Sequence, residues 1–320
     1  MPGSIPGSAT ADSRERVEAG TRVVATAASA GTRRTAWTRF VTLVRRKPLG
    51  ALSAVILCGV VAVAILAPVV APYDPYQFNL DHRGLPVRLQ APNATFLLGT
   101  DALGRDVLSR LVYGARVSLL VGFASVLAGT LLGTVLGLAS GYCEGGVDSV
   151  LQRGVDTVMA VPGIVLALAV MSVLGQSLVN VIVVIAIVIA PGASRVVRGA
   201  VLAVKQNTFV DAAYAAGAAP WRIVLCHILP NVFAPILVIA TVWLGNAIVI
   251  EAALSFLGLG TPPPTPTWGA MLSGEGRRNL ETAPYLAIFP GLAISVVVLA
   301  FNMLGDAVRD VLDPQLRTSR

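Results

Sequence analysis

Six apolar stretches, each long enough or nearly long enough to cross a bilayer as a helix, constrain this 320-residue chain more than any other feature. A hydrocarbon core of about 30 Å needs roughly 20 apolar residues in a helix, and backbone groups in lipid must bond within their own segment. Charged residues make up 13% of the chain, against roughly 25% in soluble domains. We therefore predict an all-α membrane protein with six transmembrane helices. The stretches are 49–71, 117–139, 158–175, 181 to about 191, 232 to about 257, and 285–304.

The third and fourth stretches are separated by a short polar turn. Residues 158–194 are too long for one crossing, and the Gly, Gln, Ser and Asn residues of 175–180 supply a turn between two crossings. The fourth stretch ends near Pro191, because the heads of Arg195 and Arg198 must reach water at its inner end.

The distribution of Lys and Arg predicts the orientation of the chain. Residues before Leu49 hold nine of the 24 basic residues, and placing them in the cytoplasm puts 17 basic residues inside and seven outside. This asymmetry follows the positive-inside rule and makes both termini cytoplasmic. It also explains the net charge of +7 without a nucleic-acid partner. Cleavage of a signal peptide after Ala62–Ala64 is the less favoured alternative.

These assignments divide the chain into four regions. We expect a largely disordered basic leader, a first transmembrane helix with an extracytoplasmic loop, a core of five transmembrane helices that carries a cytoplasmic loop at about 205–231, and a cytoplasmic tail. Their bounds are 1–46, 47–116, 117–308 and 309–320.

The chain lacks the motifs of a nucleotide hydrolase or another enzyme. No phosphate-binding loop is present, and neither Lys47 nor Lys205 follows a glycine-rich turn. The two histidines, His82 and His227, fall on opposite sides of the predicted membrane, which disfavours a shared metal site. We predict no catalytic residue, no metal and no cofactor of its own for this chain.

Between the fourth and fifth stretches lies a segment too polar to cross a bilayer, DAAYAAGAAPWRIVLCHILPN at 211–231. It predicts an alanine-rich helix, a break at Gly217, and a second amphipathic helix that starts near Pro220 and is broken by Pro230. The small side chains of Ala212 and Ala213 would let another surface approach the backbone closely. The segment is either a mechanical handle for a partner or an ordinary structured loop.

The pattern of Asp211, Ala212, Ala213, Gly217 and the later Ile-Leu-Pro resembles the EAA loop of binding-protein-dependent ABC importers. This chain differs from the family at Asp211, where the family usually has glutamate. The acidic group is kept on a shorter side chain, so the resemblance does not say which residue it contacts. Further stretches resemble the C-type permease of dipeptide, oligopeptide and nickel importers. They are LLGTDALGRDVLSRLVYGARVSL at 97–119, CHILPN at 226–231, EAALSFLGLGTPPPTPTWGAML at 251–272 and NMLGDAVRDVLDPQLR at 302–317.

The resemblance implies a type I ABC importer permease fold in the bacterial cytoplasmic membrane. The partners implied are a second permease, two ATPase subunits or one fused ATPase that bind ATP and magnesium, and an extracytoplasmic solute-binding protein. Di- and oligopeptides are the expected solutes; nickel, another small solute, or an ion-coupled secondary transporter are the alternatives. The residues expected to couple to the ATPase are Asp211, Ala212, Ala213, Gly217, Ala218, Pro220, Trp221, Ile228, Leu229 and Pro230.

Two further sets of residues are candidates for roles inside the membrane. A repeat of small residues on one helix face at Gly129, Gly133, Gly137 and Gly141 favours close helix packing over a substrate-lining surface. Glu251, with Asn246 and Asn302, is a candidate for the translocation pathway, because ionisable groups within spans are costly; a bond from Glu251 to a neighbouring helix is the favoured alternative. Outside, Trp268 is expected at an interface or docking surface, and Asp101, Arg105 and Asp106 in a local ion-pair structure.

Overall fold

The computed structural model describes residues 48–312, and every named element in that range is a helix. The predicted leader 1–46, the last eight residues of the tail and the cytoplasmic position of both termini lie outside the described residues. The helices are α3 (Pro48–Ile65), α4 (Ala67–Val70), α5 (Val107–Cys143), α6 (Gly145–Met159), α7 (Gly163–Leu174), α8 (Leu178–Lys205), α9 (Thr208–Ala215), α10 (Pro220–Arg222), the π-helix η1 (Ile223–Ile228), α11 (Leu229–Phe256), α12 (Trp268–Leu272), α13 (Gly274–Arg278) and α14 (Tyr285–Leu312).

Five helices in the described range are long and apolar enough to span a membrane: α3, α5, α8, the continuous helix Pro220–Phe256, and α14. A sixth crossing is present if α6 and α7 form one broken span. The all-helical prediction is confirmed, and the expected number of crossings is reached only when this pair is counted.

The third predicted stretch, 158–175, is not one helix. α6 ends at Met159 and α7 begins at Gly163, and the two helices meet at 88°. Pro162 lies between them as the N-cap of α7, with φ −54° and ψ 129°. Because proline fixes φ, lacks an N–H and disfavours helix in the residue before it, the chain bends here. With 12 residues, α7 alone is about 18 Å long, shorter than the hydrocarbon core.

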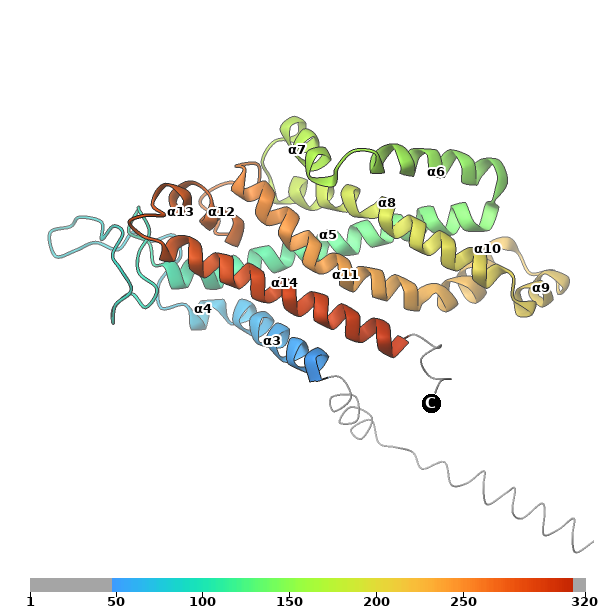
Figure 1. The fold of residues 1–320 in the computed structure, drawn as a ribbon, viewed down its shortest axis with the longest axis horizontal. Helices are drawn as coiled ribbons and strands as arrows, with labels where there is room; N and C mark the ends of the chain where they lie inside the picture. Colours follow the sequence, from blue (N-terminus) through green and yellow to red (C-terminus); the bar gives the residue numbers. More distant parts are fainter. Residues whose placement is uncertain (1–47, 313–320) are drawn as a thin grey trace, which may run out of the picture. The chain divides into compact units, whose positions relative to one another are not determined.

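The helix pair α5 and α8 forms the centre of the bundle, and Figure 1 shows the two helices running side by side. α5 begins at Val107, ten residues before the predicted stretch, because the carboxylate of Asp106 caps it by accepting from the Ser109 backbone N–H at 2.7 Å. α8 continues through Pro191 to Lys205, beyond the predicted end of the fourth stretch. α5 therefore extends beyond its predicted apolar stretch at the N-terminal end, and α8 extends beyond its stretch at the C-terminal end.

A second layer packs α3, α11 and α14 against α5. Its core contains Leu57 from α3, Leu119 from α5, Ile248 from α11 and Phe301 from α14. α11 also contacts α8, so it links the two layers.

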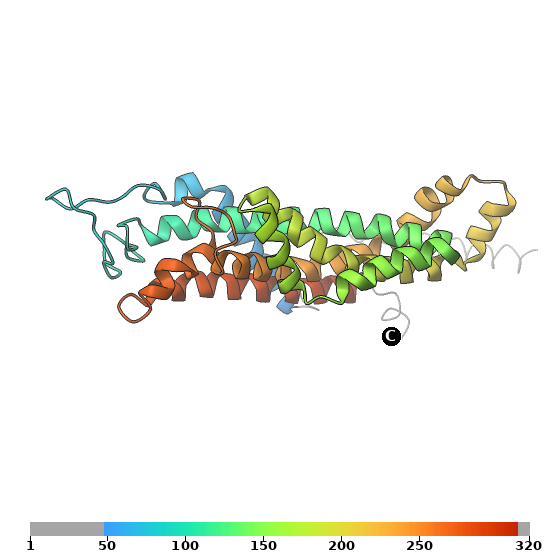
Figure 2. The same cartoon turned by 90° about the horizontal axis from the view of Figure 1, so that it is seen from above.

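The segment 205–231 and the helices α12 and α13 lie at opposite ends of the bundle, as both views show (Figures 1 and 2). The loop that precedes α5 lies at the same end as α12 and α13. This arrangement agrees with the topology expected for a cytoplasmic 205–231 segment.

Candidate functional site

The 205–231 segment contains the short helix α9 and the first turns of a second helix, joined by a turn. α9 covers Thr208–Ala215, and Gly217 adopts a left-handed conformation with φ +73°. Glycine adopts this conformation without strain, so the predicted break occurs at this residue. Pro220 then begins α10 at its first turn, as expected.

The prediction that Pro230 breaks the second helix is wrong. α10, η1 and α11 form one continuous helix from Pro220 to Phe256. A proline crowds the carbonyl four residues earlier, which here belongs to Cys226 inside η1. The wider i→i+5 turn of the π-helix gives that carbonyl room, so the chain passes Pro230 and enters the membrane without a break.

The residues expected to couple to the ATPase divide into an outward and an inward group. Ile228 is fully buried, and Ala213, Ala218 and Leu229 are half-buried in the same apolar cluster. Ile228 therefore contacts this chain and not a partner. The exposed members are Asp211, Ala212, Gly217, Pro220, Trp221 and Pro230.

Large apolar side chains add to this exposed surface. Trp221 is 66% exposed, and Phe209, Tyr214 and Leu225 are also exposed. Of these four residues, Trp221 is among those expected to couple to the ATPase; Phe209 and Tyr214, both on α9, are not. The exposed side of this segment therefore carries aromatic and aliphatic side chains in addition to alanine and glycine.

The four glycines of the predicted small-residue face all lie against α8. A Cβ atom added to Gly133 would lie 2.6 Å from the Ala190 carbonyl oxygen and 2.6 Å from the Ala193 Cβ. At Gly137 the Ser194 carbonyl oxygen would be 2.7 Å away, and Gly129 and Gly141 are similarly close to α8. The backbones of α5 and α8 therefore touch along this face, which lines no open path.

Glu251 is fully buried and bonded to neighbouring hydroxyl groups. Its carboxylate accepts from Ser118 of α5 at 3.2 Å and from Ser255 at 2.8 Å. Ser118 also accepts the backbone N–H of Trp268 at 3.3 Å. Glu251 thus ties α11 to α5 beneath α12, an arrangement that favours the packing alternative.

Asn246 and Asn302 are both exposed on this chain, on α11 and α14. The Asn302 side chain lies against Gly245, where an added Cβ would be 3.1 Å from its Oδ1 atom. The structure therefore does not bring either asparagine together with the buried Glu251.

Trp268 is 2% exposed and does not form an outer surface, contrary to the sequence prediction. Its indole N–H donates to the Leu111 carbonyl at 3.0 Å. The amphipathic ring is buried by α5, and its polar edge is satisfied there.

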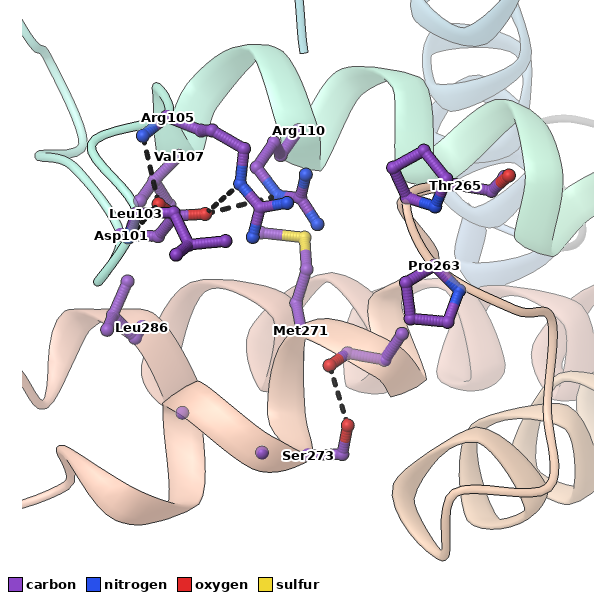
Figure 3. A pocket seen from close by; sticks show the side chains of 14 residues that line it. Asp101, Leu103, Arg105, Val107, Arg110, Pro263, Thr265, Met271, Ser273 and Leu286 are labelled. Atoms are coloured by element: carbon purple, nitrogen blue, oxygen red, sulfur yellow. Dashed lines mark hydrogen bonds and ion pairs between the residues drawn. The ribbon is translucent and has the colours of Figure 1, made fainter. Parts of the chain in front are cut away.

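A pocket of about 330 Å³ opens near the end that carries α12 and α13. Figure 3 shows Asp101, Arg105 and Arg110 on one wall, with Met271 and Ser273 opposite. The Arg105 Nε atom lies 2.6 Å from Asp101 Oδ2, and the Arg110 Nε atom lies 3.6 Å from the same oxygen. Asp106 takes no part in this cluster and caps α5 instead. The predicted ion-pair structure therefore includes Asp101 and Arg105, as expected, together with Arg110.

A second hollow of about 670 Å³ lies between α8, α11 and α14, near the 205–231 end. Asn231 at the start of α11 and Arg309 near the end of α14 both line it. Neither hollow is lined by Glu251, Asn246 or Asn302.

Several spanning helices, with the helical segment 205–231 exposed at one end, are the arrangement expected of a permease subunit. The chain belongs to the family described as the binding-protein-dependent transport system inner membrane component, which matches residues 133–318. Residues 33–92 match the N-terminal TM domain of oligopeptide transport permease C. It is therefore a multi-pass protein of the inner membrane.

Similar proteins cover nearly the whole chain. The glutathione transport system permease protein GsiD of Pectobacterium atrosepticum is 42% identical over 89% of this chain and 93% of its own length. GsiD proteins of Escherichia coli and Shigella boydii are 44% identical over 89% of this chain and 92% of their own lengths.

The fold is similar to chains from two crystal forms of the inward-facing MetNI methionine ABC transporter. Their TM-scores are 0.52 and 0.54 at 20% identity, and the match covers 64% of this chain and 96% and 97% of those chains. The predicted type I importer permease fold is confirmed by this similarity together with the family match.

Proposed function

We propose that this chain is the permease subunit of an ATP-driven importer of di- and oligopeptides, and that it takes its motion from a partner ATPase through the 205–231 segment. It forms half of the translocation pathway with a second, homologous permease. Two ATPase subunits or one fused ATPase bind ATP and magnesium, and an extracytoplasmic binding protein delivers the solute. The permease itself performs no hydrolysis.

The exposed surface around Gly217 supports this proposal. Asp211, Ala212 and Trp221 are exposed there, while Ile223 and Ile228 anchor the same segment in the bundle. A force applied to the exposed side is thus transmitted to the buried side through a stiff element. Membership of a transport family that depends on binding proteins supports the proposed set of partners.

Peptides are the favoured solutes because relatives at 42–44% identity are named for glutathione, a tripeptide. The match to an oligopeptide permease domain points to the same chemical class. Nickel and other small solutes remain the alternatives, and each is added as a competitor to the glutathione uptake assay described below.

The proposal is tested by placing a large side chain on the 205–231 surface. At Gly217 an added Cβ meets no atom within 4 Å, so Gly217→Leu projects outward without an internal clash. We expect this variant to insert normally, to lose co-purifying ATPase, and to lose uptake of radiolabelled glutathione in proteoliposomes that contain ATP.

Two controls separate the surface effect from backbone strain. Gly84, in the loop before α5, has the same left-handed conformation, φ +74°, and the same open surroundings, so Gly84→Leu carries an equal strain at the opposite end. Gly217→Asn introduces a residue that tolerates this conformation. Normal ATPase association in Gly217→Leu, or equal loss in Gly84→Leu, would refute the assignment.

A further inference from the structure

The end of α5 is hydrogen-bonded to α9 through two tyrosines. The Tyr214 hydroxyl of α9 donates to the Tyr142 hydroxyl of α5 at 2.8 Å. Tyr142 lies in the last turn of α5, 72 residues earlier in the chain. This bond joins the 205–231 segment directly to a membrane helix that is not its neighbour in sequence.

Lys205, the last residue of α8, bonds to the same place. Its Nζ atom donates to the Tyr142 backbone carbonyl at 2.8 Å and to the Glu144 carboxylate at 2.8 Å. The ammonium also lies 5.4 Å from the centroid of the Tyr142 ring, within the range of a cation–π contact. Tyr142 is therefore held by α8 on one side and by α9 on the other.

An apolar cluster lies beside this junction. Val210 of α9 and Ile223 of η1 are fully buried with Val201 of α8 and Leu138 of α5. Apolar contact holds α9 against the bundle but is non-directional. Hydrogen bonds have angular preferences, so the bond between Tyr214 and Tyr142 favours one rotation of α9 on that cluster.

We propose that Tyr142, Lys205 and Tyr214 form a positioning junction that transmits motion of α9 to the helix pair α5 and α8. The inference rests on the proposed function, because it requires an ATPase to move α9. α5 and α8 are in backbone contact along the glycine face. A displacement delivered to the C-terminal ends of both helices therefore moves them as one body. Tyr142 acts through Tyr214 and Lys205 and requires no contact with the ATPase or the solute.

The inference is tested in the whole complex, reconstituted with its second permease, ATPases and binding protein. The variants are Tyr142→Phe, Tyr214→Phe and the double variant, with Tyr113→Phe near the outer end of α5 as the matched control. Each single variant removes one hydroxyl group and keeps the ring, and the double variant removes both hydroxyl groups of the junction. The measured quantity is the number of radiolabelled glutathione molecules taken up per ATP hydrolysed; dialanine replaces glutathione if the wild-type complex does not take it up.

We expect each single variant near the junction to lower this ratio roughly 2-fold to 10-fold, as the loss of one hydrogen bond implies. The KM for solute should stay unchanged. Because the two hydroxyl groups share one bond, the double variant should lose no more than the larger single effect. Lys205→Met should lower the ratio, and Lys205→Arg, which keeps the charge, should restore part of it.

The outcomes distinguish failure of the proposed function from failure of the junction alone. If the ATPases do not co-purify with the wild-type permease, the proposed function fails, and the junction fails with it. If they co-purify with every variant and the ratio stays at the wild-type value, the junction alone is refuted. Loss of ATPase from the Tyr142→Phe complex would also overturn the positioning role, since it would show that Tyr142 supports assembly and not transmission.

Discussion

The Arg198 guanidinium of α8 holds the Asp148 carboxylate of α6 at two points, with Nε 2.7 Å from Oδ1 and Nη2 2.5 Å from Oδ2. The Ser140 hydroxyl of α5 donates to the same carboxylate, and Gln152 donates to Ser140 at 2.8 Å. Three helices therefore meet at one ion pair. The paired forks of guanidinium and carboxylate also fix the direction in which α6 lies on α8.

Asp148→Asn is expected to loosen α6 and to lower the stability of the bundle by about 1 kcal/mol, between the values for exposed and buried pairs. The Asp148 side chain is 16% exposed, so solvent screens the pair only in part. The matched control is Asp156→Asn, because Asp156 pairs with Arg195 on the same two helices but is 57% exposed. Thermal unfolding in detergent measures both, and equal midpoints in the two variants would contradict the structural role of Asp148.

Gly133→Ala is expected to destabilise the helix pair by about 1–3 kcal/mol, the usual cost of overpacking. The added methyl would lie 2.6 Å from the Ala190 carbonyl oxygen, so α5 and α8 must separate. Gly199→Ala in α8 is the control, because an added Cβ there meets no atom within 4 Å, and alanine favours a helix over glycine. The yield of folded protein and its thermal midpoint should fall in the first variant and not in the second. An unchanged Gly133→Ala would show that the glycine face is not a tight contact.

The apolar stretches and the 205–231 segment could be predicted from sequence because each depends on local pattern. Hydropathy reports which residues avoid water, and Gly217 with Pro220 marks a helix end and a helix start. The extension of α5 to Val107 was missed because its first turns carry Arg110 and Arg116, which hydropathy reads as loop. The Asp106 cap was the available signal for this boundary.

The remaining differences arise from contacts between residues distant in sequence. Trp268 is buried because Leu111 lies beside it, and Tyr142 meets Tyr214 across 72 residues. A one-dimensional pattern says that Ile228 is apolar but not whether its own chain or a partner covers it. The π-helix that lets the chain pass Pro230 has no composition signal, since it is a small change in backbone bonding.

Tyr285→Phe is expected to release the loop that precedes α5. The Tyr285 hydroxyl at the start of α14 lies 3.0 Å from both the Gln90 and the Thr100 carbonyl oxygens, so its single proton is shared between two points of that loop. Its loss should raise the rate of limited proteolysis in residues 80–100 roughly 2-fold to 10-fold, the range for one hydrogen bond. Tyr76→Phe, which changes an exposed tyrosine in the same loop, should leave the rate unchanged. If Tyr285→Phe is cleaved at the wild-type rate, the Tyr285 hydroxyl does not hold this loop in place.

Glu251→Ala is expected to lower the free energy of unfolding by about 1–3 kcal/mol, because the buried hydroxyl groups of Ser118 and Ser255 would lose their shared acceptor. Glu251→Gln keeps one carbonyl acceptor and should lose less. If the carboxylate acts in packing, neither change shifts the KM for solute in the folded fraction. If Glu251 lies on the solute path, both changes shift the KM and have little effect on stability. Val249→Ala, at an exposed position on the same helix, serves as the reference for a change that leaves the core intact. Thermal unfolding and the concentration dependence of uptake, measured on the same preparations, therefore decide between the two roles: a raised KM at an unchanged thermal midpoint would place Glu251 on the solute path.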